Sequence, residues 1–491
     1  MQLQVKRRPW PYLDTVVQDV RNLELTQEIR LSEGMPDIGR VLCAWGQPVL
    51  RGKEWRQDRV SLSGGLMLWV LYLPQEGDKP ECVEGWIPFR MDWDLPGDGP
   101  DGQLQVKCLC RFADARGISP RKLMIRARVG VKAEAFVPAE GEIAEPDTVP
   151  EGMELLTHRW PLRVNTEAGE TQLQPEEQLR WPEGEFVPER VVCCRAEPAV
   201  TECRIVGNKV VFRGNGNLRL ICRSADGKLQ SREIPLPFSQ FAELKQEYGN
   251  DAQGEVTVSP TSLETEVDDD GQIILRCAMT AQYLVTDRQT VELGADAYIP
   301  GREVQIRREA LDVPVVLETR RETLPGEQSL GLEGMETVEL QLLAEFPRQR
   351  RTGEELELTV PGTVQALYYG PDGSLNTASA RWEGRMTLRC DGETAVTAQV
   401  MPPRMHPSGS WEVPVEVRSC ARQRLPMVTE VIPGQQAAKD PERPSLILRR
   451  TGEKSLWEIA REAGTTREAI RKANGLTEEP KPDQLLLIPV P

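Results

Sequence analysis

The chain has 491 residues, of which 39% are hydrophobic and 28% are charged, and its formal net charge at pH 7 is −16. The apolar content excludes a disordered chain, and at roughly 150 residues per domain the length predicts about three domains. The acidic balance argues against general nucleic-acid binding, which requires a basic surface that displaces counterions from the phosphates.

Histidines and cysteines form no recognisable catalytic or metal-binding pattern. The two histidines, His158 and His406, lie far apart in the sequence, and neither belongs to a zinc-hydrolase motif. The eleven cysteines include the adjacent pair Cys193-Cys194 but no C-x-x-C pair. We therefore expect a non-enzymatic protein without a metal site or a cofactor. Most cysteines are interpreted as small buried residues in a reducing compartment.

No segment has the properties of a signal peptide or a membrane span. The N-terminal segment contains Lys6, Arg7 and Arg8, but no apolar stretch follows them. The longest strongly apolar run is Leu66–Leu73, far shorter than the roughly 18 residues that a membrane-spanning helix needs. We therefore expect a cytoplasmic protein without a membrane span.

Internal repeats predict the domain organisation. Arg40–Cys43 (RVLC) recurs as Arg190–Cys193 (RVVC), and Val60–Gly64 (VSLSG) recurs as Val210–Gly214 (VVFRG), both at an offset of 150. In each copy an alternating apolar segment follows, as expected for a β-strand with one buried face. The constant offset predicts two related antiparallel β modules.

A third copy is partial. Gly216–Leu229 matches Gly362–Leu375 at an offset of 146, with an Asp-Gly pair in both segments, at 226–227 and at 372–373. Asp-Gly between alternating segments predicts a β-hairpin, because glycine adopts a positive φ without strain. We therefore expect a mostly β fold with two or three tandem antiparallel modules. The predicted boundaries are residues 1–150 and 151–305 for two complete modules and 306–431 for the partial third repeat.

Tryptophan is frequent in the first module. Trp69 and Trp86 occupy predicted strand positions and are expected in the core. Trp45 and Trp55 lie near predicted turns, so they are candidates for exposed residues that contact a partner.

The start of the first module resembles a known family. Leu31–Leu42 (LSEGMPDIGRVL) is similar to the entry of a SPOCS domain, in which a Pro-Asp-Ile triplet, here residues 36–38, precedes the first strand. Ile87-Pro88-Phe89 fits the same pattern further along the chain. The resemblance covers about residues 25–140 and, without the triplet, about 155–300. SPOCS domains occur in spore-forming Firmicutes, so the resemblance implies a role in spore morphogenesis.

The C-terminal residues 446–491 resemble a LysM domain, a small α+β unit with the order βααβ, and they follow a polar, Pro-bounded linker at 432–445. Ser455 is predicted to cap a first helix that carries Trp457 into the core, and Thr466 is predicted to cap a second helix. The strands are expected at the two ends of this unit.

LysM domains bind N-acetylglucosamine polymers in a shallow groove between two loops, and the resemblance implies a groove at the matching loops here. The sequence departs from the family in both places. The first loop has one extra residue, and Asp483 stands where the family commonly has glycine. Binding of a glycan and docking of a protein therefore both remain open. The candidate binding residues are Gly452, Glu453, Lys454, Ser455 and Leu456 in the first loop and Pro482, Asp483, Gln484 and Leu485 in the second.

SPOCS-like modules followed by a LysM-like unit resemble the organisation of spore morphogenesis proteins. The resemblance implies an adaptor in the mother-cell cytoplasm, at the forespore surface, that helps the basement-layer ATPase of the coat to encase the forespore. The alternative is a protein of the cell envelope or spore cortex that binds peptidoglycan or N-acetylglucosamine oligomers. A cell-wall hydrolase is disfavoured, because the sequence offers no nucleophile, metal site or acid pair.

Overall fold

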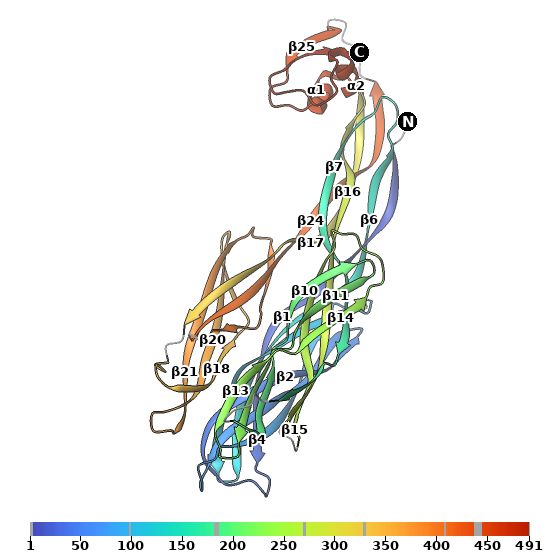
Figure 1. The fold of residues 1–491 in the computed structure, drawn as a ribbon. Helices are drawn as coiled ribbons and strands as arrows, with labels where there is room; N and C mark the ends of the chain where they lie inside the picture. Colours follow the sequence, from blue (N-terminus) through green and yellow to red (C-terminus); the bar gives the residue numbers. More distant parts are fainter. Residues whose placement is uncertain are drawn as a thin grey trace.

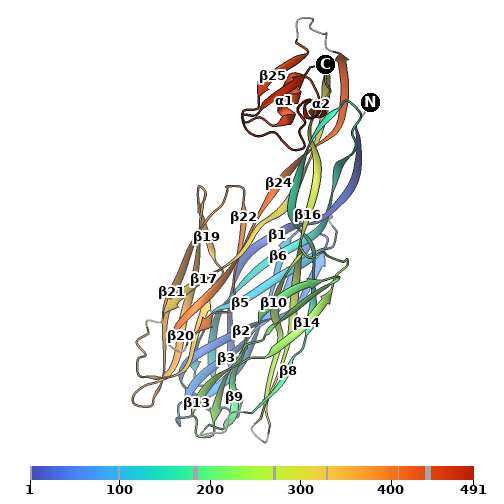
Figure 2. The same cartoon turned by 45° about the horizontal axis from the view of Figure 1, so that its top comes forward.

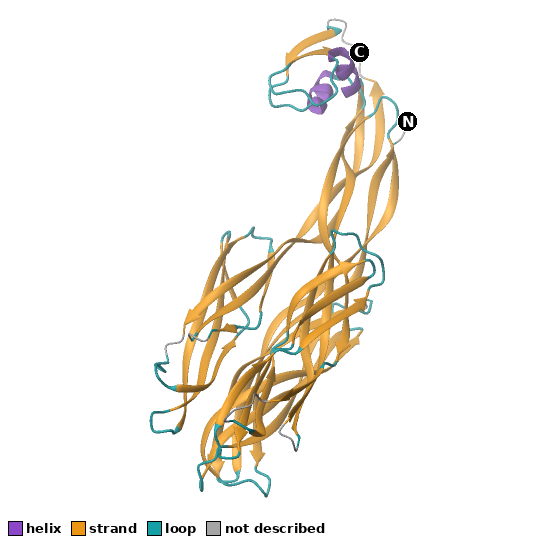
Figure 3. Ribbon diagram, viewed as in Figure 1, coloured by secondary structure: helices purple, strands orange, loops and turns teal. Residues whose placement is uncertain are grey.

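The computed structural model describes residues 3–97, 100–180, 186–268, 272–327, 330–406, 409–436 and 444–490. The fold is mostly β, with 74% strand and 3% helix, and its sheets are antiparallel, which confirms the predicted class at this level. The molecule is elongated, and two short helices lie at one end beyond the tips of the longest strands (Figures 1 and 3).

The first segment of the chain forms two antiparallel sheets. Its strands are β1 (Gln4–Arg30), β2 (Ile38–Arg56), β3 (Arg59–Pro74), β4 (Glu81–Asp94), β5 (Gln103–Ser119) and β6 (Lys122–Thr148). The first strand pairs with the last along its whole length, and β5 lies on the other side of β6. The strands β2, β3 and β4 form the second sheet as a meander. Alternate residues of β6, such as Val129 and Val131, are fully buried because side chains alternate between the two faces of a strand.

The second segment contains more but shorter strands. They are β7 (Glu154–Leu173), β8 (Glu176–Arg180), β9 (Pro188–Ala196), β10 (Ala199–Val206), β11 (Lys209–Asn215), β12 (Leu218–Ser224), β13 (Leu229–Ile234), β14 (Pro237–Glu243), β15 (Gln253–Val267) and β16 (Gln272–Tyr298). The long β16 pairs with β7 on one side and β15 on the other. The hairpin predicted at Asp226-Gly227 is confirmed, because β12 pairs with β13 and Gly227 has a φ of +92°.

The third segment repeats this arrangement. Its strands are β17 (Arg302–Glu327), β18 (Glu336–Ala344), β19 (Arg348–Thr352), β20 (Glu355–Tyr369), β21 (Leu375–Arg389), β22 (Ala395–Val400), β23 (Arg404–Met405) and β24 (Ser410–Gln436). Again the first long strand, β17, pairs with the last, β24, and β22 lies on the other side of β24. The hairpin predicted at Asp372-Gly373 joins β20 to β21, with a φ of +76° at Gly373.

Strand pairing moves some of the predicted boundaries. Arg302–Gln305, assigned from the sequence to the second module, begins β17 and pairs with the end of β24. Ile432–Gln436, the first part of the predicted linker, is the end of β24 itself, whereas residues 437–443 lie outside the described residues. The motif spacing located the middle of each segment, but the long closing strands extend beyond the motifs. We call residues 3–436 the body and residues 444–490 the C-terminal unit.

The three segments of the body are packed against one another through shared apolar clusters. One cluster joins Trp45 and Trp69 of the first segment to Cys193 of the second and Leu367 of the third. Trp45 is only 4% exposed, so the prediction that it is an exposed contact residue is wrong. Trp55 is half-buried against the core of the first segment, Trp69 is buried as predicted, and Trp86 is half-buried. The sequence could not show this packing, because Trp45 is covered by residues of the other segments.

The cysteines are free thiols, and six of the eleven are buried. Within the described ranges, no helix combines the length and apolar character that crossing a membrane would require.

The C-terminal unit consists of β25 (Leu446–Arg450), α1 (Leu456–Ala463), α2 (Arg467–Asn474) and β26 (Leu485–Pro489), and its two strands pair antiparallel. It lies at the end of the body where β7 and β16 project (Figure 2).

Candidate functional site

Both helices of the C-terminal unit begin at the predicted capping residues. The hydroxyl of Ser455 accepts a hydrogen bond from the backbone N–H of Glu458 at 3.3 Å, and the Glu458 carboxylate accepts one from the Ser455 N–H at 2.8 Å. This reciprocal pair is a capping box. Thr466 accepts from the N–H of Ala469 at 3.1 Å. The caps fix where each helix starts, and therefore also where the loops before them end.

The small core of this unit explains the position of the first loop. Leu456, Ile459, Ile470 and Leu486 are fully buried in it. Trp457 is 7% exposed and packs edge-on against Tyr298 of β16, with ring centroids 5.5 Å apart. The side chain of Leu456, one of the predicted binding residues, is thus part of the core and unavailable to a ligand.

The structure brings the two predicted loops together. The N–H of Thr451 donates to the carbonyl of Gln484 at 3.0 Å, and the Thr451 hydroxyl donates to the carbonyl of Lys481 at 2.9 Å. From the other end of the first loop, the N–H of Leu456 donates to the carboxylate of Glu479 at 3.3 Å. The loops therefore form one continuous surface.

Most of the predicted binding residues on this surface are exposed. Lys454 is exposed and forms an ion pair at 2.5 Å with Glu462, whose pKa is lowered by hydrogen bonds from Lys454 and Arg449. Asp483 is exposed with a φ of +59°, and Gln484 is half-buried, its side-chain oxygen accepting from the Lys481 N–H at 2.9 Å. The other exposed members of the predicted set are Gly452, Glu453, Ser455, Pro482 and Leu485.

Polar contacts hold the C-terminal unit on the body, and they involve residues that lie outside the two loops. The carboxylate of Glu154 on β7 accepts from the backbone N–H of Arg467 at 3.0 Å and from its Nε at 2.6 Å. The hydroxyl of Tyr298 donates to the carbonyl of Thr465 at 3.0 Å, and Arg461 pairs with Asp296 of β16 at 2.5 Å. These contacts use the last turn of α1, the turn between the helices and the start of α2, so the loop surface stays open.

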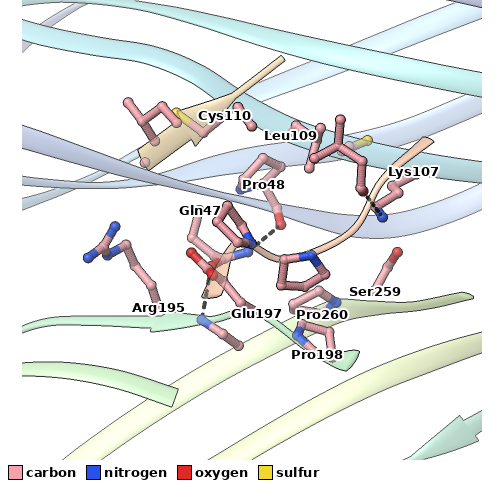
Figure 4. Close-up of a pocket in the computed structure, with 18 of the residues that line it drawn as sticks. Gln47, Pro48, Lys107, Leu109, Cys110, Arg195, Glu197, Pro198, Ser259 and Pro260 are labelled. Carbon is pink, nitrogen blue, oxygen red and sulfur yellow. Dashed lines mark hydrogen bonds between the residues drawn. The ribbon is translucent and has the colours of Figure 1, made fainter. Parts of the chain in front are cut away.

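Sequence reasoning missed a second feature, a pocket of about 120 Å³ where all three segments of the body meet (Figure 4). The Gln47 side chain accepts from the N–H of Ala196 at 3.0 Å, and the Lys107 ammonium donates to the carbonyl of Val400 at 2.6 Å. Burial lowers the pKa of Lys107 to about 8, with a further contribution from Lys132. The pocket therefore combines a mostly apolar lining with a few polar contacts that join the segments.

The repeat offset was the signal that could have located this pocket. Gln47-Pro48 and Glu197-Pro198 lie 150 residues apart, which is the offset of the repeated motifs, and both pairs line the pocket. Burial raises the pKa of Glu197, as expected for a carboxyl removed from water.

Buried ion pairs cross between the segments around this junction. Arg195 of β9 pairs with Glu339 of β18, and both side chains are only 2% exposed. Arg418 of β24 pairs with Glu134 of β6 at 2.5 Å, with 8% and 10% of the side chains exposed. A buried charge without its partner costs several kcal/mol, so these pairs favour one arrangement of the three segments.

No family model matches the chain, and no match was found among curated proteins or solved structures.

Proposed function

We propose that the chain is a non-enzymatic spore morphogenesis adaptor of the SipL type, built from three SPOCS-like β modules and a C-terminal LysM-like unit. The repeated pairing of first and last strands supports the modular interpretation, since it occurs in β1 and β6, in β7 and β16, and in β17 and β24. The order strand, helix, helix, strand supports the LysM-like interpretation of the C-terminal unit.

The observation that carries the adaptor proposal is the attachment of the C-terminal unit to the body. Contacts of Glu154 and Tyr298 fix this unit at one end of an elongated molecule and leave the loop surface open. Such an arrangement suits a protein that presents a docking surface at one end of an elongated body. The proposed partner is the basement-layer ATPase of the spore coat, met in the mother-cell cytoplasm at the forespore surface.

The alternative, a peptidoglycan-binding protein of the envelope or cortex, has one specific observation in its favour. The two loops lie together and are largely exposed, and a LysM groove recognises N-acetylglucosamine polymers through such loops. The two exposed residues Lys454 and Asp483 offer a test, provided that Asp483 is replaced by asparagine, which tolerates the positive φ of that position. Exposed substitutions without backbone strain usually change stability by less than about 0.5 kcal/mol.

The test compares two ligands with one pair of variants. The full chain should co-sediment with the purified ATPase and not with insoluble peptidoglycan. The double variant Lys454→Ala, Asp483→Asn should bind the ATPase more weakly. Glu468→Ala, Lys472→Ala on exposed positions of α2 is the control with the same change in charge, and it should bind as the unmodified chain does. Strong peptidoglycan binding that the loop variant abolishes, with ATPase binding untouched or absent, would favour the alternative.

A further inference from the structure

The strand β25 has an open hydrogen-bonding edge. The N–H of Val490 donates to the carbonyl of Ser445, and the N–H of Thr451 donates to the carbonyl of Gln484, at 2.9 and 3.0 Å. Bonded pairs alternate along an antiparallel ladder, so the odd-numbered residues 445–451 face β26. The backbone groups of Leu446, Leu448 and Arg450 consequently point away from it, and among the described residues β26 is the only strand that pairs with β25.

The same residues carry exposed apolar side chains. Leu446 is 50% exposed, Leu448 is 63% exposed, and Leu485, opposite Arg450 on β26, is 52% exposed. Directly opposed residues of an antiparallel pair project to the same face, so these leucines form one apolar face together with the half-buried Leu487.

Two other edge strands, β19 and β21, present a different surface. All five side chains of β19, from Arg348 to Thr352, are polar and exposed, and the exposed positions of β21 include Arg381, Glu383 and Arg385. Charged side chains on an edge prevent association with further strands. The edge of β25 carries Leu446 and Leu448 at the corresponding exposed positions. The strand therefore lacks charged protection along its first part and has an exposed charge only at its end, at Arg450.

We propose that β25 is a docking edge to which a partner protein adds an extended strand of alternating apolar residues with an acidic residue opposite Arg450. The backbone groups of the added strand pair with those of Leu446, Leu448 and Arg450, and its apolar side chains continue the leucine face. This inference rests on one part of the proposed function, namely that the C-terminal unit docks a protein. It assigns that docking to the sheet edge, which runs into the loop surface at Thr451.

The charges favour a partner protein over a second copy of the chain. Arg450 is exposed, and its guanidinium donates to the carbonyl of Asp483 at 3.3 Å without a carboxylate within ion-pair distance among the described residues. Two copies of β25 paired antiparallel about Leu448 would place Arg450 beside Leu446, again without a carboxylate. Each copy also carries a net charge of −16, which opposes self-association.

The test uses a proline that removes one outward N–H. Leu448→Pro deletes a donor of the open edge and leaves the ladder to β26 intact, and proline is tolerated at such edge positions. Binding of the full-length variant to the purified ATPase should weaken at least about tenfold, while Leu448→Thr, which keeps the N–H, should weaken it only about threefold. Arg450→Glu, at an exposed position, should also weaken binding about tenfold. Equal melting of all variants verifies that the unit remains folded.

The outcomes separate this inference from the proposed function. If the unmodified chain does not bind the ATPase, the proposed function is wrong, and the inference that this edge docks the ATPase is overturned with it. If the unmodified chain binds and both Leu448→Pro and Arg450→Glu bind within twofold of it, the strand-addition inference alone is wrong. If sedimentation instead shows a dimer of the unmodified chain that Leu448→Pro converts to a monomer, the occupant is a second copy and the inference is overturned. Should Leu448→Pro unfold the unit, Arg450→Glu decides between these results.

Discussion

Glu154 on β7 holds Arg467, the first residue of α2, through both its backbone N–H and its side chain, at 3.0 and 2.6 Å. The carboxylate thereby meets the positive end of the helix as well as a guanidinium, two interactions that each favour a negative charge. This buried side chain thus orients the C-terminal unit together with Tyr298 and Asp296 of β16. Glu154 is separated from Arg467 by more than three hundred residues in the chain, so no local sequence pattern pointed to the contact.

Removing this contact should release the C-terminal unit. Glu154→Ala removes the acceptor of the Arg467 N–H and Nε, although the carbonyl of Leu155 still accepts from the guanidinium at 3.0 Å. We expect a loss of about 3 kcal/mol in docking free energy. Hydrogen exchange of the amides at 465–469 should accelerate, while exchange in the central strands of the body should not change. Glu468→Ala, an exposed carboxylate in the same turn, is the control. Unchanged exchange in Glu154→Ala would show that the unit is held by other contacts.

Trp457 should be required for the fold of the C-terminal unit as well as for its docking. Trp457→Ala removes a buried aromatic from a small core, and such substitutions cost about 3–5 kcal/mol. Tyr298→Phe removes only the hydrogen bond to Thr465 and should cost about 1 kcal/mol. Chemical denaturation followed by hydrogen exchange in α1 separates the two effects. Similar exchange in both variants would contradict a core role for Trp457.

The helix cap at Ser455 should contribute to local stability. Ser455→Ala removes the acceptor for the Glu458 N–H and should destabilise α1 by about 1 kcal/mol, whereas Ser455→Asp retains an acceptor and should be nearly neutral. The measurement is the exchange rate of the amides in the first turn of α1. Equal rates in the alanine and aspartate variants would exclude a capping contribution.

Acid should weaken the junction between the first and third segments. Burial raises the pKa of Glu134, but Lys132 and Arg418 outweigh it and lower the pKa to about 2. A carboxyl whose pKa is depressed on folding stabilises the native state above its unfolded pKa of about 4.3, and this stabilisation is lost as the pH falls toward 2. Glu134→Gln should cost about 3 kcal/mol at pH 7, and the difference from the unmodified protein should shrink between pH 4 and 2, measured by urea unfolding. A difference that is constant with pH would refute this role.

The fold should need neither disulfides nor a metal. Burial raises the pKa of the Cys110 thiol to about 11 and that of Cys193 to about 12, so both are protonated at neutral pH and react slowly. The midpoint of thermal unfolding should therefore be the same with and without a reductant and a chelator. A large drop under either reagent would indicate a disulfide or a metal site that the thiol geometry does not suggest.

Local features of this fold could be predicted from the sequence, whereas contacts between segments could not. The Asp-Gly turns at 226–227 and 372–373 and the caps at Ser455 and Thr466 form as predicted, because each depends on residues within a few positions. The prediction that Trp45 is exposed is wrong because the residues that cover it come from segments far along the chain. The pocket and the ion pairs around it also form between residues far apart in the chain, such as Arg195 and Glu339, so no local pattern predicts them.

The pairing of first and last strands in each segment has a consequence for synthesis of the chain. β1 ends at Arg30, but its partner β6 begins only at Lys122, so at typical translation rates β1 waits on the order of ten seconds for its partner. The apolar cluster around Trp45 is completed later still, because two of its members, Leu367 and Leu375, belong to the third segment and are synthesised last. How long this tryptophan stays uncovered on the ribosome is therefore set by the speed of elongation and not by the intrinsic folding rate of any one sheet.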